Sequence, residues 1–429
     1  MQPTTHEPCL YSGNVQRHRI LFLRQVDDFA VAASTKDAAL HLIHLINQHM
    51  RIEVKQLGVI DRFNGVDVHQ TRDYIKITCE KYLFNMLKHH DWLATTPHIA
   101  PIPLQSDPRL MAKLEQATPP TTIAAKEDLK QRMGFHYRQV IGEVIYPMMK
   151  CRPDIAYPAT KLSQYMENPA QEHYEALRQL CSYLSHTIDH GIYYWRQAPR
   201  EDLPQLPHPT LHHDNYTSNV NPSDLHDLTG FVDADWATDT KHRRSVTGIA
   251  LMYAGGVVGY KTKYQDTIAL SSTEAEFTAA CDAAKLILFF RSLLDDLGIP
   301  QHQATVLYED NNGALMMANA QQPTRRTRHM DIRQFALLDW VERDLITLHR
   351  ISTHDNTADT MTKVLGRQLF YRHCDSLMGR RTPTRFMRSN PALGHSSTCP
   401  TRPPSGHRLE HGGGKIRTLR HSISRLGIT

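Results

Sequence analysis

Residues 230–237 read Gly230-Phe-Val-Asp-Ala-Asp-Trp-Ala237 and belong to the run Leu228–Trp236, whose pattern is typical of a β-strand. Four further strands are predicted farther along the chain, at residues 246–253, 257–260, 304–308 and 346–351. Helices are predicted between and after the later strands, at residues 273–297, 312–319 and 331–343. This alternation predicts an α/β fold for residues 228–363.

Four acidic residues lie at particular places in these predicted elements. Asp233 lies in the first strand, Glu276 at the start of the long helix, Asp310 at the end of a strand and Asp359 after the last strand. Elements in this order can bring the four side chains to one edge of a sheet. Crowded carboxylates raise one another's pKa, and divalent cations with oxygen ligands remove that cost. Two such ions about 4 Å apart can activate water and stabilise the leaving oxygen of a phosphodiester.

Each acid taken alone has a simpler explanation. Glu276 with Thr273 fits a helix capping box, and Asp310 and Asp359 fit solvated turns or helix N-caps. Asp233, together with Asp235 and Asp239, fits an exposed acidic edge. The prediction of a site therefore depends on the joint order and context of the four acids.

The upstream half of the chain has a different organisation. Two apolar runs, 20–26 and 29–33, flank Asp27 and Asp28 and predict a hairpin with the carboxylates at its turn. Residues 127–187 look largely helical. Pro-rich segments at 95–125 and 197–227 predict linkers, and the Arg-, Pro- and Gly-rich stretch after Gly379 predicts disorder.

Composition excludes several classes of protein. A chain of 429 residues predicts about two to four domains, and 40% hydrophobic residues exclude disorder along the whole length. No apolar run approaches the ~18 residues of a membrane helix, and no secretory signal is visible. Seven scattered cysteines without a CxxC pair predict reduced thiols rather than a disulfide frame or zinc site. Residues 380–429 carry a net charge of +9, which leaves −4 for residues 1–379 of a chain with net charge +5.

Six sequence blocks in one order resemble the RNase H domain of copia-type LTR retrotransposon Pol polyproteins. The blocks are Gly230-Phe-Val-Asp-Ala-Asp-Trp-Ala237, Arg243-Arg-Ser-Val-Thr-Gly248, Ala269-Leu-Ser-Ser-Thr-Glu-Ala-Glu-Phe277, Glu309-Asp-Asn-Asn312, Arg328-His-Met-Asp-Ile-Arg333 and Ala358-Asp-Thr-Met-Thr-Lys363. The resemblance implies a five-stranded mixed sheet flanked by helices. It also implies that Asp233, Glu276, Asp310 and Asp359 are catalytic acids that bind two Mg²⁺ ions, with Mn²⁺ as a substitute. Glu274 and Asp235 are the second choices for Glu276 and Asp233.

The resemblance extends upstream over roughly residues 7–379. Val26-Asp-Asp28 resembles the family's Tyr-Val-Asp-Asp polymerase motif, which implies that Asp27 and Asp28 bind metal. Tyr137-Arg-Gln-Val-Ile-Gly142 and Cys151-Arg-Pro-Asp-Ile-Ala156 resemble the thumb and connection. The implied organisation is a truncated reverse transcriptase palm fragment (1–94), a linker (95–126), a thumb/connection-like helical region (127–196), a linker (197–227), an RNase H-like domain (228–379) and a basic tail (380–429).

Departures from the family pattern affect the polymerase part. Gln25 replaces the aromatic residue that usually precedes Val-Asp-Asp, and only 26 residues precede Asp27. The family's upstream metal-binding Asp and its fingers lie N-terminal to this hairpin and are absent here. We therefore expect no RNA-directed DNA polymerase activity from this chain alone.

An RNA–DNA hybrid is the predicted partner, and phosphate binding requires cations. The predicted phosphate-binding residues near the acids are Lys241, Arg243, Arg244, Lys261, Lys263, Arg325, Arg326 and Arg328. A solvated loop is the alternative for the run at 324–329.

For Trp236, core packing is favoured over a stacking role. The tail fits a nucleic-acid-binding arm, but read-through or a gene-model artefact is favoured.

The predicted function is an RNase H-type endonuclease that hydrolyses the RNA of RNA–DNA hybrids. The alternative is an inactive or host-retained element remnant that binds nucleic acid without cleaving it. A DDE-type transposase or integrase core is disfavoured, because the surrounding blocks and the position of Glu276 match RNase H. Other Pol fragments are possible partners, no membrane association is expected, and the expected location is cytoplasmic (within a particle if the element is active), with the nucleus as the alternative.

Overall fold

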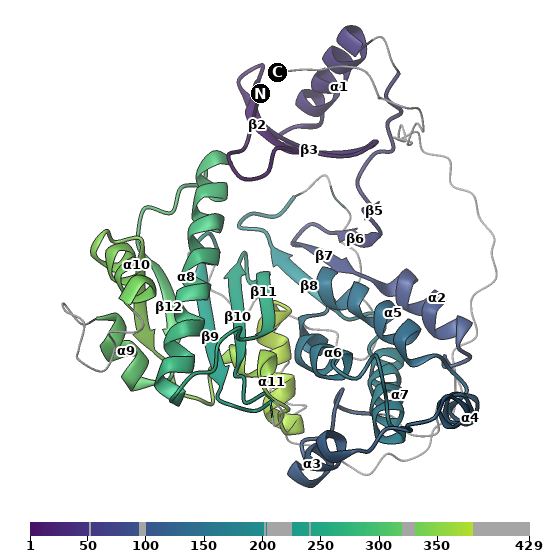
Figure 1. The fold of residues 1–429 in the computed structure, drawn as a ribbon. Helices are drawn as coiled ribbons and strands as arrows, with labels where there is room; N and C mark the ends of the chain where they lie inside the picture. Colours follow the sequence, from purple (N-terminus) through teal and green to yellow (C-terminus); the bar gives the residue numbers. More distant parts are fainter. Residues whose placement is uncertain are drawn as a thin grey trace. The chain divides into compact units, whose positions relative to one another are not determined.

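The computed structural model describes residues 1–50, 53–93, 100–200, 203, 225–239, 242–319 and 331–380, with the backbone alone for 331–334. The predictions for Lys241, Arg325, Arg326, Arg328 and the 380–429 tail beyond its first residue lie outside the described residues. The described chain divides into two compact units, residues 1–64 and residues 65–380. Figure 1 shows the helices and strands of both units.

The first unit is a four-stranded antiparallel sheet with one helix. Its strands, in spatial order, are β1 (Gln2–Pro3), β2 (Leu10–Val15), β3 (His18–Gln25) and β4 (Asp28–Ala33). Helix α1 (Lys36–Met50) packs on this sheet through Ala38 and Leu42, and the short β5 (Arg62–Phe63) follows. A two-residue loop joins β3 to β4, so the predicted hairpin around Asp27 and Asp28 is confirmed.

The second unit contains a small antiparallel sheet and a group of helices. The sheet pairs β6 (Val66–Gln70) with β7 (Tyr74–Thr78) and β7 with β8 (Gly191–Trp195). The sequence analysis did not predict β8. The helices are α2 (Glu80–His89), α3 (Pro108–Gln116), α4 (Ile123–Met133), α5 (Tyr137–Lys150), η1 (Pro153–Ile155), α6 (Ala156–Ser163) and α7 (Gln171–His186).

The structure corrects the expectation that residues 95–126 form an extended linker. This segment contains α3 and the start of α4. The side chain of Asp107 accepts a hydrogen bond from the backbone N–H of Arg109, and Pro108 occupies the first helical turn. Proline is compatible with that position because its missing N–H would have no partner there anyway. A Pro-rich composition therefore concealed a capped helix, whose Leu114 is buried.

The large sheet of the second unit contains both parallel and antiparallel pairs. Its strands are β9 (Thr229–Asp235), β10 (Val246–Tyr253), β11 (Gly256–Tyr264), β12 (Thr305–Glu309) and β13 (Ile346–Arg350), in the order β11-β10-β9-β12-β13. Strand β10 is antiparallel to β9 and β11, whereas β12 is parallel to β9 and β13. The predicted five-stranded mixed sheet is confirmed.

Helices cover both faces of this sheet. Helix α8 (Ser272–Asp296) packs on one face, where Val232 and Leu251 join its core, and α9 (Asn312–Ala318) and α10 (Asp331–Glu342) flank it (Figure 1). Alternate residues of a strand point to opposite faces. Accordingly Ala250 and Met252 join a second core, together with η4 (Thr357–Met361), α11 (Arg367–Leu377) and the helices of the upstream segment.

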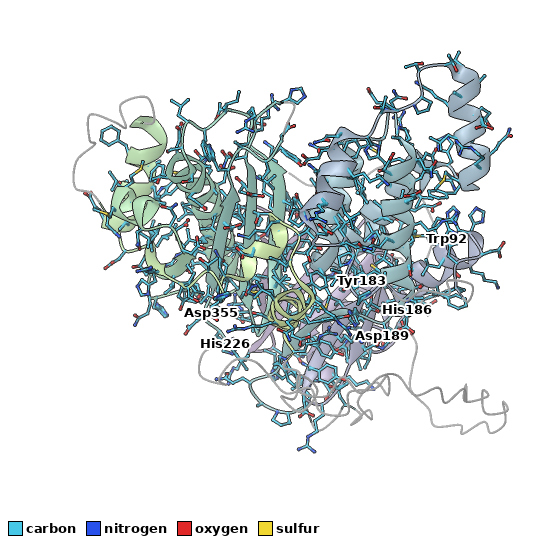
Figure 2. The ribbon with its side chains drawn as sticks, turned by 90° about the horizontal axis from the view of Figure 1, so that it is seen from below. Trp92, Tyr183, His186, Asp189, His226 and Asp355 are labelled. Carbon is cyan, nitrogen blue, oxygen red and sulfur yellow. The ribbon has the colours of Figure 1, made fainter. Side chains whose placement is uncertain are left out.

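This second core shows that the upstream helices and the large sheet fold as one compact unit. A buried polar network lies among these helices: the Arg152 guanidinium donates to both carboxylate oxygens of Asp154 and to the backbone carbonyl of Thr187. Tyr183 of α7, labelled in Figure 2, donates its hydroxyl to Asp154. A buried ion pair is tolerated when its remaining hydrogen-bonding atoms are satisfied in this way. Among the described helices, none combines the length and apolar character that a membrane crossing requires.

Candidate metal-binding site

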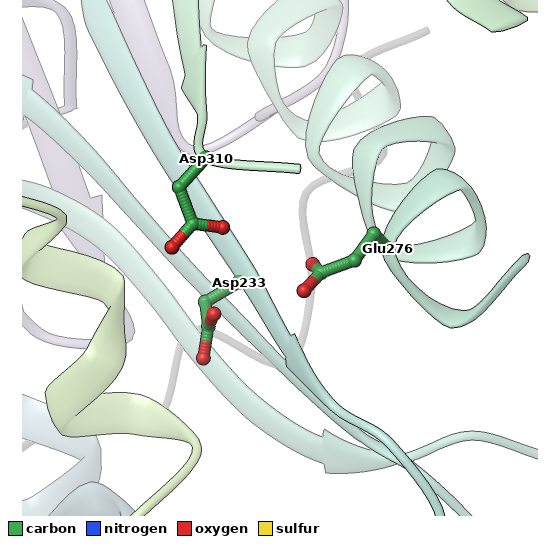
Figure 3. Close-up of side chains that lie close together, drawn as sticks. All are labelled: Asp233, Glu276 and Asp310. Atoms are coloured by element: carbon green, nitrogen blue, oxygen red, sulfur yellow. The ribbon is translucent and has the colours of Figure 1, made fainter. Parts of the chain in front are cut away.

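Three carboxylates from separate elements meet beside the large sheet. Asp233 lies on β9, Glu276 near the start of α8, and Asp310 directly after β12. One carboxylate oxygen of each lies within 4.8 Å of the others (Figure 3). The parallel register of β9 and β12 pairs Phe231 with Tyr308, so Asp233 and Asp310 follow the same pairing two residues later. Strand order thus explains how residues 77 positions apart become neighbours.

The helix capping box does not use Glu276. Ser271 is the N-cap of α8, and its hydroxyl accepts a hydrogen bond from the backbone N–H of Glu274. The Glu274 carboxylate in turn accepts from the backbone N–H of Leu270. The alternative that Glu276 simply caps the helix with Thr273 is therefore wrong. Glu276 lies two residues farther on, where its buried side chain is turned toward Asp233 and Asp310 (Figure 3).

Asp359 lies in η4, on the face of the sheet that carries Asp233. The cap of η4 is Asn356, whose side chain accepts from the N–H of Ala358 and donates to the carbonyl of Val232 on β9. Asp359 is therefore not a helix cap, and only 1% of it is exposed. It lies outside the three-acid cluster that meets the 4.8 Å limit. Asp355, labelled in Figure 2, pairs with Arg372 and ties the preceding loop to α11.

Lys363 connects Asp359 to the cluster. Its Nζ lies 2.8 Å from Oδ1 of Asp359 and 3.6 Å from Oδ2 of Asp233. The hydroxyl of the neighbouring Thr362 donates to the same Asp233 oxygen. Burial lowers the pKa of Lys363, but Asp233 and Asp359 together raise it above its ordinary value. In this structure the ammonium group therefore neutralises two buried carboxylates.

Burial and mutual repulsion raise the pKa values of the acids. Burial, followed by the charges of Glu309, Asp233 and Asp310, raises the pKa of Glu276 to about 11. Burial is also the largest cause for Glu309, whose pKa rises to about 8, for Asp359, which rises to about 7, and for Asp235, which rises to about 6. Burial likewise raises the pKa of Asp233. Without a cation, this cluster favours protonated carboxyls.

Two buried carboxylate oxygen atoms lack a hydrogen-bond partner in the described protein and could bind a cation instead. Oε2 of Glu276 and Oε2 of Glu309 are buried and have no hydrogen-bond partner among the described residues. Such atoms are rare because an unpaired buried acceptor is costly. The donor set consists of carboxylate oxygens, which are the ligands that Mg²⁺ and Ca²⁺ prefer. The residues present therefore fit a hard divalent cation.

Glu309, Thr362 and Lys363 contribute to the site although the sequence did not single them out. Glu309 is fully buried at the end of β12, and its Oε1 accepts from the N–H of Asn311. A signal was available for Glu309, because Leu307 is buried and alternate strand residues share a face. For Lys363 the signal was its spacing of four residues after Asp359.

Four of the predicted phosphate-binding residues lie in the described part of the chain, in a loop and on a strand of the large sheet. Arg243 and Arg244 are exposed in the loop that follows β9. Lys261 and Lys263 on β11 pair with acids of this chain: Lys261 lies 3.8 Å from Asp282 and Lys263 lies 2.8 Å from Asp266. These contacts are on partly exposed side chains and are therefore weak.

Asp27 and Asp28 lie in the first unit. Asp27 is in the two-residue hairpin loop, and Asp28 is the exposed first residue of β4. Within the described ranges, the three-acid cluster does not include them, and no group of three possible metal ligands forms around them.

Trp236 is not a core residue, which corrects the packing prediction. Its side chain is 45% exposed, and its indole N–H donates a hydrogen bond to the carbonyl of Ala269. Strand β9 ends at Asp235, so Trp236 lies beyond the paired part of the sheet.

The fold and the site define an α/β protein with a mixed sheet and a buried carboxylate cluster that can hold a metal ion. No family model matches the chain. It is 27% identical over 379 residues to the retrovirus-related Pol polyprotein from transposon TNT 1-94 of Nicotiana tabacum, covering 88% of this chain and 26% of that protein. It is 26% identical over 358 residues to the corresponding polyprotein from transposon RE2 of Arabidopsis thaliana, covering 83% of this chain and 22% of that protein.

Over most of its length the chain is similar to Ty1/copia-type retrotransposon Pol polyproteins, which confirms the resemblance seen in the sequence. It spans about a quarter of the length of these curated relatives. Among solved structures, LC11-RNase H1 isolated from compost has 13% sequence identity and a TM-score of 0.26, covering 32% of this chain and 93% of that chain. The same enzyme in complex with an RNA/DNA hybrid has a TM-score of 0.22, covering 30% and 88%.

Lys363→Met tests the role of this ammonium group in the metal-free protein. The change leaves Asp233 and Asp359 without their shared cation, so we expect a loss of about 1–2 kcal/mol of stability, because Lys363 is partly exposed. Mg²⁺ should then raise the melting temperature more than it does in the wild type. Differential scanning fluorimetry with and without Mg²⁺ measures both effects. Lys285→Met removes an exposed lysine as the control, and an unchanged response to Mg²⁺ in Lys363→Met would contradict the assignment.

Proposed function

We propose that this chain is an RNase H-type nuclease that hydrolyses the RNA strand of RNA–DNA hybrids with two bound Mg²⁺ ions. The observation that carries the proposal is the convergence of Asp233, Glu276 and Asp310 within 4.8 Å, from β9, α8 and the end of β12. The similarity to Pol polyproteins supports it, because the six sequence blocks around these acids are the ones that resemble RNase H. Residues 1–94 are proposed as part of a reverse transcriptase palm, with Asp27 and Asp28 in the hairpin.

Asp233, Glu276 and Asp310 would hold one divalent cation, and Asp359 with Asp233 would contribute to the second. Such ions supply an activated water and stabilise charge on a phosphodiester. The remaining tasks fall to residues of the chain itself. Thr362 orients the Asp233 carboxylate by a hydrogen bond, and Asn356 holds η4 against β9 through the carbonyl of Val232.

The proposed contacts with the hybrid involve cations near the cluster. Arg243 and Arg244 are exposed in the loop between β9 and β10, the two strands adjacent to the site. An exposed guanidinium group can donate two parallel hydrogen bonds to one phosphate. Arg325, Arg326 and Arg328 stay a prediction from the sequence.

A second candidate function is hybrid binding without cleavage. The observation that favours it is the position of Lys363, whose Nζ already neutralises Asp233 and Asp359. If this ammonium group is not displaced, its positive charge repels a second cation between Asp233 and Asp359. The two candidate functions predict different results with the same substrate.

Cleavage of a hybrid distinguishes the two functions. The purified chain is incubated with a 5′-labelled RNA annealed to DNA, with Mg²⁺ or with EDTA, and the products are resolved on a denaturing gel. We expect Mg²⁺-dependent cutting of the RNA strand, with 3′-hydroxyl ends, and no cutting of the same RNA when it is single-stranded or paired with RNA. Binding that persists in EDTA, with no cutting in Mg²⁺ or Mn²⁺, would favour the non-catalytic function instead.

A further inference from the structure

Two buried thiols from distant parts of the second unit face each other. Cys79 is the N-cap residue of α2, and Cys151 is the C-cap residue of α5. Their Sγ atoms lie 3.1 Å apart although the residues are 72 positions apart in the chain. Neither residue has any exposed surface. The sequence analysis expected seven scattered and reduced cysteines, and the fold brings these two together.

The two sulfur atoms are close enough for a disulfide to form after a small movement. A disulfide bond has an S–S length of about 2.05 Å, so the two sulfur atoms need to approach by about 1 Å. Both residues lie at junctions, Cys79 between β7 and α2 and Cys151 between α5 and η1. Small rotations of the side chains at such helix ends do not break a continuous helix. The approach therefore requires less rearrangement than it would from two helix interiors.

The two sulfurs differ in character, which gives them different roles. The Cys151 thiol donates a hydrogen bond to Cys79, and this bond lowers the pKa of Cys79, with a further contribution from the Arg152 charge. The same hydrogen bond and burial raise the pKa of Cys151. The thiolate is the reactive form of cysteine, so Cys79 is the attacking sulfur.

We propose that Cys79 and Cys151 are a redox-modification site that forms a reversible intramolecular disulfide with a small peroxide as the oxidant. The Cys79 thiolate attacks one peroxide oxygen, the O–O bond breaks, and a sulfenic acid forms with release of water after protonation. The Cys151 sulfur then attacks the Cys79 sulfur, its proton leaves with the hydroxyl group as a second water, and the S–S bond forms. Two thiols and one hydrogen peroxide thus yield one disulfide and two waters. A small oxidant is required because both sulfurs are buried.

The disulfide would close a long loop across the helical part of the unit. It would link the β7–α2 junction to the α5–η1 junction, next to the buried Arg152–Asp154 pair. Closing a loop of this size restricts the unfolded chain and therefore stabilises the folded one. The expected shift is a rise in melting temperature of about 5 °C or more for the oxidised protein.

Oxidation of the full chain with hydrogen peroxide, followed by quenching and peptide mapping without reductant, tests the proposal. We expect one cross-linked peptide that contains Cys79 and Cys151, an intact mass lower by two hydrogens, and reversal of both by dithiothreitol. The higher melting temperature should appear in the oxidised protein and disappear after reduction. Cys9→Ser, which changes a thiol outside the pair, should leave the cross-link intact.

Other products would overturn the inference. A cross-link between any other two cysteines, or conversion of Cys79 to its sulfinic or sulfonic acid with Cys151 still reduced, contradicts it. So does a chain that keeps all its thiols while peroxide oxidises its exposed methionines. Cys151→Ser should accumulate the sulfenic acid at Cys79, trapped with dimedone. Because the wild-type peptide map decides the question by itself, the conclusion does not depend on the folding of that variant.

Discussion

Asp310→Asn is expected to abolish hybrid cleavage by this chain. Asp310 supplies one of the three clustered carboxylates, and an amide replaces a negatively charged oxygen by a neutral group that binds a divalent cation weakly. Changing residues that only orient metal ligands typically costs 10- to 100-fold, so loss of a ligand itself should cost at least about a hundredfold. The measurement is the initial rate of RNA cleavage in the hybrid at saturating Mg²⁺.

Stability separates this effect from unfolding. Asp310 contributes to the repulsion that raises the pKa values of Glu276 and Glu309, so the metal-free variant should be at least as stable as the wild type. Asp339→Asn provides the matched control, because Asp339 is an exposed acid on α10 that pairs only at the surface with Arg343. Full cleavage activity in Asp310→Asn would show that Asp310 is not part of the catalytic site.

Glu276→Gln is expected to stabilise the metal-free protein at neutral and alkaline pH. The pKa of Glu276 is about 11 in the folded chain, far above the value of about 4.3 in an unfolded chain. Between these values the folded state binds a proton that the unfolded state has lost. The contribution of Glu276 to stability is therefore present below pH 4 and declines as pH rises through this window.

Neighbouring acids add to the same pH dependence. The pKa of Glu309 rises to about 8 and that of Asp359 to about 7. Ionisation of either residue therefore also lowers the stability of the folded protein as pH increases. The neutral amide that Glu276→Gln introduces removes the strongest of these contributions. At pH 8 without metal we expect the variant to be more stable by at least about 2 kcal/mol, and the difference should shrink toward pH 5.

Thermal unfolding across pH 5–9 in EDTA measures this difference. At this chain length a change of 2 kcal/mol corresponds to roughly 2–3 °C in melting temperature. Mg²⁺ should raise the melting temperature of the wild type at pH 8 and raise that of Glu276→Gln much less. Glu342→Gln, an exposed change on α10, is the control. Equal pH profiles of the wild type and Glu276→Gln would show that Glu276 ionises as an ordinary solvated acid.

Local sequence patterns predicted most secondary structure in the second half of the chain. The limits of β10 agree with the prediction, and α8 agrees within one residue at each end. Such elements have strong local signals: Ser271 caps α8, Gly298 and Pro300 follow it, and apolar residues fill β10 on both faces. Burial on both faces explains why β10 shows a continuous apolar run rather than an alternating one.

The same reasoning failed where local composition conflicted with tertiary contacts. Helix α3 was hidden in a segment whose prolines suggested an extended linker. Strand β8 was missed because its strand character depends on pairing with β7, more than 110 residues earlier in the chain. Trp236 was expected in the core because aromatic residues are usually buried, but its position just beyond β9 leaves it 45% exposed.

The sequence by itself indicated the resemblance to Pol polyproteins and the mixed α/β character of residues 228–363, because these depend on ordered blocks and local periodicity. It also indicated four acids as site residues, and the structure brings three of them together. Only the tertiary structure decided that Glu276 is free of the helix cap, that Lys363 neutralises Asp233 and Asp359, and that Glu309 lies buried beside the cluster. The same holds for the contact between Cys79 and Cys151. The physical reason is that burial, pKa and side-chain contact depend on the order of strands in the sheet and on helix packing, which link residues far apart in the chain.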